Sequence, residues 1–339
     1  MLDRRRVIAG LTAVSAAATL PATSRAAEPL KIRLAYAAAP AQLVPVIFQN
    51  PSILKHYGKS YTVDSIYFGG SAEELTALGA EEVDIAALAF STFGLAIQNA
   101  RMDDLRVIGD LYQDGVGEHY SSEYVVGKDS PIHSVKDLKG KTLTSNGVGG
   151  AVDIAMRKML RDNGLEDKRD YTVVEAKFPN MPSMLESGKV DLAGMIAPFS
   201  LRAKKEAGVR TLFTIKDAMG VAQTTLMAAR KPFIDKNRAA LVDFFEDAQI
   251  GTKWFLDPAN RGPAIDIVAK FTRQPVAAYQ DWLFTKSDYY RDPDVRPNLT
   301  ALQSNLAVQK DLGFLKIEID AARYADLSLL EEAAKRRGG

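Results

Sequence analysis

Residues 83–89 read Val-Asp-Ile-Ala-Ala-Leu-Ala, and this nearly continuous apolar run decides the fold class. A strand with one solvated face alternates polar and apolar residues, whereas a strand that is covered on both faces is apolar almost throughout. The segment therefore predicts a strand of a parallel sheet that carries helices on both of its faces.

Strand-like and helix-like runs alternate on either side of this segment. Residues 31–36 alternate polar and apolar side chains, and a β-prone run at 62–68 ends at a glycine pair that precedes a helix-like run at 73–78. Further strands are predicted at 106–111, 123–126, 142–145, 172–176, 190–196 and 209–213, and the chain reads as largely helical from residue 234 onward. This alternation indicates an α/β protein with mostly parallel sheets flanked by helices.

The length of the chain, 339 residues, exceeds the usual size of a single hydrophobic core, so two lobes are expected. We expect residues 27–118 and 227–339 to form lobe 1, and residues 119–226 to form lobe 2. The chain would then cross between the lobes near residues 119–124 and 220–226. Paired crossings of this kind form a hinge, because a few residues absorb the rotation of two rigid bodies.

The first 26 residues have the three parts of a secretory signal peptide. Arg4-Arg5-Arg6 precede a mildly apolar stretch from Val7 to Leu20, and small residues surround a predicted cleavage site near Ala26. The consecutive arginines also resemble a twin-arginine signal, so both this route and the Sec route remain open. Either route predicts a mature protein in the periplasm.

The composition excludes several classes of site. The chain contains no cysteine, which excludes disulfides, iron–sulfur clusters, zinc–thiolate sites and a thiol nucleophile. Its three histidines, His56, His119 and His133, lack the spacing of metal ligands. A net charge of +1 provides no field that would favour nucleic acid. We therefore expect a soluble monomer without cofactor or metal and without a nucleic-acid partner.

Several short motifs occur in the order found in a known family. In chain order they are Glu82 to Ile85, Asp129-Ser130-Pro131-Ile132, Gly188 to Ala193, and Pro198-Phe199. The second of these is followed by Val-Lys-Asp-Leu-Lys-Gly-Lys at 135–141. Together they resemble the periplasmic substrate-binding proteins of ABC importers of the nitrate/sulfonate/taurine type, the NMT1/THI5-like family. The resemblance covers about residues 30–230.

The resemblance implies a two-lobed periplasmic-binding-protein fold of type II, with the ligand in the cleft between the lobes. It implies capture of a small solute by closure of the lobes. Backbone donors and aromatic walls in the predicted loops favour an anionic solute, of the sulfonate or aromatic carboxylate type, and a neutral heterocycle such as a pyrimidine or flavin remains open. The implied partner is an ABC permease, and no enzymatic activity is expected. Two departures bear on the solute: Ile196-Ala197 replaces the family's Trp-Asp, and residues 147–150 lack the hydroxyls that bind a sulfonate.

Candidate binding residues lie where predicted strands lead into helices. In open α/β sheets ligands bind beyond the carboxyl ends of the strands, where helix N-termini present free N–H groups and glycines allow close approach. Tyr36 and Phe199 would supply flat apolar walls, and Glu123 lies near the predicted hinge. The candidates are Tyr36, Gln42, Gly70, Ser71, Ser91, Thr92, Glu123, Asn146, Gly149, Gly150, Pro198 and Phe199. Each has a structural alternative as a cap, a turn or a core residue.

Two other functions remain open from the sequence. The chain could present a ligand to a membrane sensor rather than to a permease. It could also be an enzyme, since one branch that resembles this family makes a thiamin pyrimidine precursor. That branch relies on histidine and on a cysteine-rich segment, whereas this chain has no cysteine.

Overall fold

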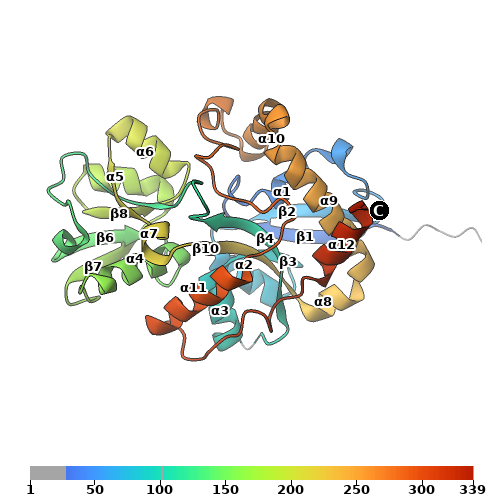
Figure 1. Cartoon of the computed structure of the whole chain (residues 1–339), viewed down its shortest axis with the longest axis horizontal. Helices are drawn as coiled ribbons and strands as arrows, with labels where there is room; N and C mark the ends of the chain where they lie inside the picture. The colour runs from blue at the N-terminus through green and yellow to red at the C-terminus, as the bar shows by residue number, and fades with distance from the viewer. Residues whose placement is uncertain (1–27, 101, 339) are drawn as a thin grey trace, which may run out of the picture.

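Two five-stranded mixed sheets, one in each lobe, form the frame of the molecule (Figure 1). The computed structural model describes residues 28–100 and 102–338, so the predicted signal peptide lies outside the described residues. The strand order is β2-β1-β3-β10-β4 in the first lobe and β7-β6-β8-β5-β9 in the second. The two-lobed α/β fold predicted from the sequence is confirmed.

The strands of the first sheet are β1 (Leu30–Tyr36), β2 (Tyr61–Tyr67), β3 (Ile85–Ala89), β4 (Leu105–Asp114) and β10 (Ala222–Arg230). Those of the second sheet are β5 (Glu123–Val126), β6 (Lys141–Ser145), β7 (Tyr171–Glu175), β8 (Leu192–Met195) and β9 (Arg210–Thr214).

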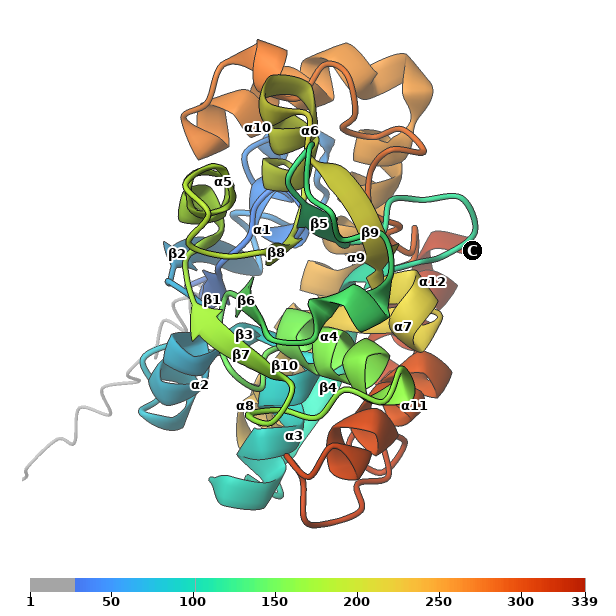
Figure 2. The same cartoon turned by 90° about the vertical axis from the view of Figure 1, so that its left-hand side faces the viewer.

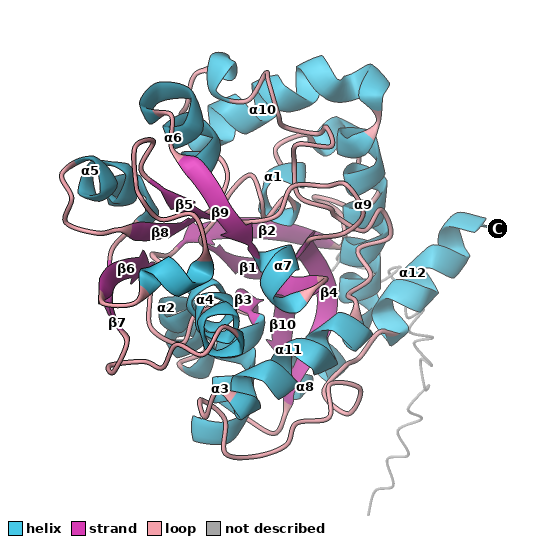
Figure 3. Cartoon of the chain, turned by 60° about the vertical axis from the view of Figure 1, so that its left-hand side comes forward, coloured by secondary structure: helices cyan, strands magenta, loops and turns pink. Residues whose placement is uncertain are grey.

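Helices cover both faces of each sheet (Figure 3). The first lobe contains α1 (Val44–Ile47), α2 (Ser71–Gly79), α3 (Phe90–Asn99), α8 (Lys231–Lys236), α9 (Arg238–Leu256), α10 (Arg261–Thr272), α11 (Leu299–Asp311) and α12 (Ser328–Gly338). The second contains α4 (Ala151–Asp162), α5 (Met181–Glu186), α6 (Phe199–Ala207) and α7 (Ile215–Met219). None of the helices in residues 28–100 and 102–338 is long and apolar enough to cross a membrane.

The apolar run at 83–89 forms the central strand β3, as predicted. Residues 85–88 are fully buried between β1 and β10. The strand begins at Ile85 because the Asp84 carboxylate is engaged with the neighbouring strand: it accepts hydrogen bonds from the backbone N–H of Arg33 (2.8 Å) and from its Nη2 (2.6 Å).

In each sheet, the antiparallel strand is the one that has just crossed from the other lobe. β5 starts opposite Met195 at the carboxyl end of β8, and β10 pairs near its start with Ala89 at the carboxyl end of β3. Both crossings therefore join the carboxyl edges of the two sheets, so these edges face one another.

The second crossing differs from the sequence-based expectation. Residues 220–226 were expected as a hinge segment and residue 226 as a boundary of lobe 2, but β10 begins at Ala222 inside the first sheet. The strand was missed because residues 222–230 do not alternate polar and apolar side chains, although Gly220 and Pro232 lie just outside them. Its conformation is fixed by pairing with β3 on one side and β4 on the other, which no local pattern reveals.

Candidate functional site

The starts of four helices lie at the facing carboxyl edges of the two sheets. α2, α3, α4 and α6 each follow a strand, and their N-cap residues Gly70, Ala89, Gly150 and Pro198 make no side-chain capping hydrogen bond. Uncapped helix starts retain backbone N–H donors and the positive end of the helix dipole. Where they are not already engaged, these donors are suited to hydrogen-bond acceptors at the facing edges of the two sheets.

The structure brings the starts of α3 and α4 together, although they belong to different lobes. Ala151 and Ile154 of α4 pack in the same apolar cluster as Phe90 and Phe93 of α3. Figure 2 looks from the second lobe, with α4 in front of the first-lobe elements. The predicted groups at residues 91–92 and 146–150 thus lie on two sides of one interface.

Among the candidate residues, Ser91 has a buried hydroxyl without a hydrogen-bond partner in the described part of the chain. Its side chain is fully buried in the first turn of α3, and its Oγ has no hydrogen-bond partner among the described residues. Its backbone carbonyl is engaged, because it accepts from Nε2 of Gln309 at 2.9 Å. A buried polar group without a partner costs about 1–3 kcal/mol. A solute group that binds this hydroxyl would recover that free energy. Thr92 beside it is half-buried.

Ser71 has a structural role. Its Oγ accepts a hydrogen bond from the Ala89 N–H at 3.0 Å and donates to the Ala87 carbonyl at 3.3 Å, which ties α2 to β3. Gly70, rather than Ser71, is the N-cap of α2, and a Cβ at Gly70 would meet no atom within 4 Å. Of this pair, the structure leaves Gly70 open to a ligand and engages the Ser71 hydroxyl.

Gln42 is also engaged within the chain, whereas Tyr36 belongs to an aromatic group. Oε1 of the buried Gln42 accepts from the N–H groups of residues 37 and 38 at 2.8 and 2.9 Å and so shapes the loop after β1. The Tyr36 ring lies 5.7 Å from Tyr67 and 5.3 Å from Phe271 of α10. Burial and the neighbouring Tyr67 raise the pKa of Tyr36.

Tyr67 and Phe271 were not predicted as site residues. Tyr67 is 65% exposed, which is unusual for a large aromatic side chain at the end of a strand. Its position at the last residue of the β-prone run was the signal that could have identified it. Phe271 lies far away in sequence, and no local pattern connects it with Tyr36.

The glycine-rich turn after β6 differs from the expected anion cradle. The Gly149 N–H donates to Oδ2 of the buried Asp153 at 2.8 Å, and the Val148 N–H donates to Oε1 of Glu175 at 2.7 Å. The Gly150 N–H donates to the Gly147 carbonyl at 3.1 Å. Three consecutive amides are therefore engaged within the chain. The Asn146 side chain is exposed beside them.

Pro198 and Phe199 begin α6 at the end of β8. The peptide between Ala197 and Pro198 is cis. The half-buried Phe199 ring stacks on Phe178 at 6.2 Å with an interplanar angle of 16°. Phe178, which follows β7, is a further aromatic that the sequence analysis missed. Each lobe thus presents an aromatic group near its carboxyl edge.

Glu123 lies at the start of β5, but its carboxylate is held within the second lobe. Oε1 is 2.6 Å from Nζ of Lys204 in α6 and accepts from the Thr211 hydroxyl at 2.8 Å. The residue is 7% exposed, and its Oε2 has no partner among the described residues. The structure therefore brings Glu123 to α6 and β9 rather than to the turn at 146–150.

The lobes touch at two places, here called the rims, on either side of the facing carboxyl edges. At one rim, Arg161 Nη1 donates to the Asp311 carbonyl at 2.7 Å, and a Cβ at Gly149 would lie 3.3 Å from the Phe314 ring. At the other rim, Lys205 lies 3.2 Å from Asp281. Near the hinge, the hydroxyls of Tyr120 and Ser200 share a hydrogen bond.

The hinge itself contains a buried carboxylate. Asp114, the last residue of β4, accepts from the Ser122 N–H at 2.9 Å and from the Ser121 hydroxyl. The Ser122 hydroxyl in turn bonds that of Tyr289 at 2.9 Å. Burial raises the pKa of Asp114 to about 6, and these hydrogen bonds oppose the shift. The first crossing is thereby held by short-range polar contacts.

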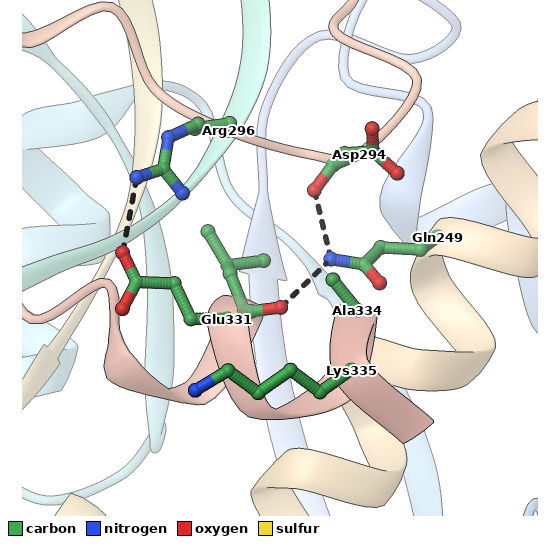
Figure 4. A pocket seen from close by; sticks show the side chains of 7 residues that line it. Gln249, Asp294, Arg296, Glu331, Ala334 and Lys335 are labelled. Atoms are coloured by element: carbon green, nitrogen blue, oxygen red, sulfur yellow. Dashed lines mark hydrogen bonds and ion pairs between the residues drawn. The ribbon is translucent and has the colours of Figure 1, made fainter. Parts of the chain in front are cut away.

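A separate cavity of about 420 Å³ lies away from the facing edges, between α9, α12 and the loop before α11 (Figure 4). The Gln249 amide donates to the backbone carbonyls of Asp294 (3.0 Å) and Leu330 (3.3 Å), and Arg296 pairs with Glu331 at 3.0 Å. These contacts attach α12 to the rest of the lobe. In residues 28–100 and 102–338, no cluster of three acidic or histidine side chains is placed to hold a metal.

Comparisons with known proteins agree with this architecture. The family model described as NMT1/THI5 like matches residues 63–260, more than half of the chain. The nitrate/nitrite binding protein NrtA of Synechococcus elongatus is 23% identical over 188 residues, which cover 53% of this chain and 42% of the relative. The matched region thus spans less than half of that relative.

Two solved structures show the same fold. The periplasmic aliphatic sulphonate binding protein SsuA of Escherichia coli has a TM-score of 0.66 at 18% identity, with 87% of this chain and 92% of that chain covered. The desulfurization enzyme DSZB has a TM-score of 0.68 at 12% identity, with 91% and 99% covered. At these identities the likeness concerns the fold alone. The family match and the shared two-lobed fold together show that the chain belongs to the NMT1/THI5-like family.

Proposed function

We propose that this chain is the extracytoplasmic solute-binding component of an ABC importer and captures a small solute by closure of its two lobes. The observation that carries the proposal is the convergence of uncapped helix starts and aromatic side chains from both lobes at the facing carboxyl edges. A solute that contacts both lobes favours the closed arrangement by its differential affinity for the two states.

The first lobe supports binding of an anionic or acceptor group of the solute. The starts of α2 and α3 carry no side-chain cap, Gly70 is open to close approach, and the buried Ser91 hydroxyl lacks a partner. The aromatic groups around Tyr36 and Phe199 support a flat body. An aromatic carboxylate fits the two lobes together better than an inorganic anion, which would leave the aromatic side chains of both lobes without contact.

We further propose that the protein lies in the periplasm and that its partner is an ABC permease. The names of the relatives, a nitrate/nitrite binding protein and a periplasmic sulphonate binding protein, support a periplasmic location and a permease partner. The signal-like sequence at residues 1–26 supports the same location. A freely diffusing monomer, which exposes both rims of the opening, would reach such a permease.

The enzymatic alternative has less support. DSZB shares the fold, but a fold does not determine a function. The chain contains no cysteine, so it offers no thiol to the chemistry of the cysteine-dependent branch that resembles this family. We therefore propose that the protein is not an enzyme. A role in presenting a ligand to a membrane sensor would use the same closure and differs only in the partner.

A thermal-shift screen of residues 27–339 tests the proposal. The protein is first unfolded and refolded to remove bound solute, and the panel contains nitrate, alkanesulfonates, aromatic carboxylates, aminobenzoates and pyrimidines. A ligand at 100 times its dissociation constant stabilises the folded state by about 2.7 kcal/mol, which raises the melting temperature by several degrees. A melting temperature that no class of compound changes would count against solute capture.

A further inference from the structure

The turn at residues 146–150 and the end of β7 bear on the chemical class of the solute. β6 and β7 are parallel neighbours with Ser145 paired to Glu175, so the glycine turn and the Glu175 carboxylate leave the sheet side by side. The turn also faces the other lobe, because Gly149 lies against Phe314. A ligand at the carboxyl ends of β6 and β7 would therefore meet both the turn and Glu175.

The central amides of the turn, at residues 148–150, are engaged within the chain and are not free for an oxyanion. The amides of Val148 and Gly149 donate to carboxylates at 2.7 and 2.8 Å, and the Gly150 amide donates to a carbonyl within the turn. The turn carries no hydroxyl side chain, since residues 147–150 are Gly-Val-Gly-Gly. An anion would have to displace one of the chain's own carboxylates to bind the Val148 or the Gly149 amide.

The charges around the turn also disfavour an anion. Arg157 is the cation of α4 nearest the turn, and it is engaged by Asp153 (Nε, 2.7 Å) and by Asp167 (Nη1, 2.7 Å). Glu175 is exposed, and it forms no ion pair with any of the described residues. Its second oxygen remains an acceptor beside the opening. A like charge nearby would be repelled, whereas an N–H or O–H donor would be bound.

The start of α3, on the first-lobe side of the interface, offers hydrogen-bond donors instead of carboxylates. The α3 start is uncapped, and the fully buried Ser91 hydroxyl there has no partner among the described residues, which marks a group that a ligand would satisfy. The aromatic pair of Phe178 and Phe199 lies in the same lobe as Glu175, and Phe178 follows it by three residues. The two lobes therefore offer different chemistry to the two ends of one flat molecule.

We propose that Glu175 is a specificity-determining residue: the second lobe selects a planar solute that presents a hydrogen-bond donor to this carboxylate, and it rejects simple oxyanions such as nitrate or an alkanesulfonate. The inference rests on the proposed function and narrows it. It separates this chain from relatives that are named for nitrate and sulphonate binding.

Calorimetric titration of the refolded protein tests this inference with two sets of probes. The oxyanion set is sodium nitrate and sodium methanesulfonate. The donor set is 4-aminobenzoate, 4-hydroxybenzoate and cytosine, with benzoate as the matched ring that lacks the donor. We expect no saturable binding of the oxyanions, and at least tenfold tighter binding of a donor-bearing ring than of benzoate.

The variant Glu175→Gln keeps an amide oxygen for the Val148 N–H and removes the charge. It should weaken binding of the donor-bearing ring about tenfold, and Glu186→Gln, an exposed glutamate of the same lobe, should change nothing. Saturable binding of nitrate or methanesulfonate to the unaltered protein overturns the inference and leaves the importer role standing. Equal affinity for benzoate and its donor-bearing analogues, the absence of binding of any of these rings, or an unchanged affinity in Glu175→Gln, also overturns it.

Discussion

Oε1 of Glu175 accepts a hydrogen bond from the backbone N–H of Val148 at 2.7 Å, across the ends of two neighbouring parallel strands. The glycine-rich turn that contains Val148 would, by its sequence alone, suit an anion. However, the chain's own carboxylates, from Glu175 and Asp153, already accept from the amides of the turn. This part of the second lobe therefore offers acceptors, and an anion is disfavoured there. The first turn of α3 in the first lobe carries no acidic residue, so the facing starts of α3 and α4 are chemically unlike.

Removal of the Ser91 hydroxyl should stabilise the protein and weaken solute binding. The variant Ser91→Ala removes a buried polar group without a partner, which should increase the free energy of unfolding by about 1 kcal/mol. Solute affinity should fall several-fold, because the proposed contact is lost. Urea unfolding and calorimetric titration measure the two effects.

Ser60→Ala is the matched control for this experiment. The Ser60 hydroxyl is also buried without a partner, but it precedes β2, at the opposite end of that strand from the facing edges. It should stabilise the protein to a similar extent without changing solute affinity. Loss of affinity in Ser60→Ala, or unchanged affinity in Ser91→Ala, would contradict the placement of Ser91 in the site.

Phe314 should hold the lobes together at one rim. Its ring lies against Gly149, and the Arg157 guanidinium lies 5.7 Å from the ring centroid. Phe314→Ala should therefore shift the solute-free protein toward open arrangements and increase its radius of gyration in small-angle X-ray scattering. Ile317→Ala, which truncates a neighbouring side chain that is 42% exposed, should leave the radius unchanged. An equal radius in both variants would show that this rim contact does not hold the closed arrangement.

The ion pair between Arg161 and Asp311, at the same rim, should stabilise the contact between the lobes less than Phe314 does. The side chains of Arg161 and Asp311 are 36% and 72% exposed, so their attraction is screened by solvent and salt. Arg161→Ala should change the free energy of unfolding by no more than about 1 kcal/mol. Any increase that Arg161→Ala causes in the radius of gyration should disappear in concentrated salt. The increase caused by Phe314→Ala should persist. A salt-independent effect of Arg161→Ala would contradict an electrostatic origin.

Stability should rise as the pH falls from 8.5 to 5.5. Burial raises the pKa of Glu74 to about 8, of Asp110 to about 7 and of Asp114 to about 6. A raised carboxyl pKa means that the folded state binds more protons than the unfolded chain in this range, so acidification favours folding. Carboxyls whose pKa is lowered, such as Asp137, lose stabilisation only at more acidic pH.

Glu74→Gln tests the largest of these contributions. Both carboxylate oxygens of Glu74 are buried without partners among the described residues. The neutral amide should increase the free energy of unfolding at pH 8.5, by an amount on the order of a few kcal/mol, and change it little at pH 5.5. Urea titrations at both values measure the difference. A variant that keeps the full pH dependence of the unaltered protein would refute the assignment to Glu74.

Local patterns predicted the frame of the fold because several strands are apolar or alternate, and because α2 and α4 follow glycine turns. The run at 83–89 identified β3, whose burial on both faces leaves no polar position. β10 escaped prediction, because a long-range pairing between two earlier strands fixes it. Local sequence therefore determines most elements here, and the return crossing depends on tertiary contacts.

The position of the candidate residues at the ends of strands could be predicted from the sequence, whereas their hydrogen-bond and aromatic partners could not. The starts of α3 and α4 do meet, but the engagement of the turn by Glu175 depends on the pairing of β6 with β7. Asp153 was foreseeable, since an acidic residue three positions after the N-cap Gly150 has the spacing of a capping box. The aromatic partners Tyr67, Phe178 and Phe271 come from separate elements and become neighbours of the predicted residues only in the folded chain.

Small-angle X-ray scattering of the refolded protein, with and without the compound that stabilises it most, tests solute capture between the lobes most directly. Capture by closure predicts that the compound reduces the radius of gyration and brings the scattering curve to that of the arrangement in which both rims touch. A compound that raises the melting temperature and leaves the radius of gyration unchanged in an open protein would contradict capture by closure.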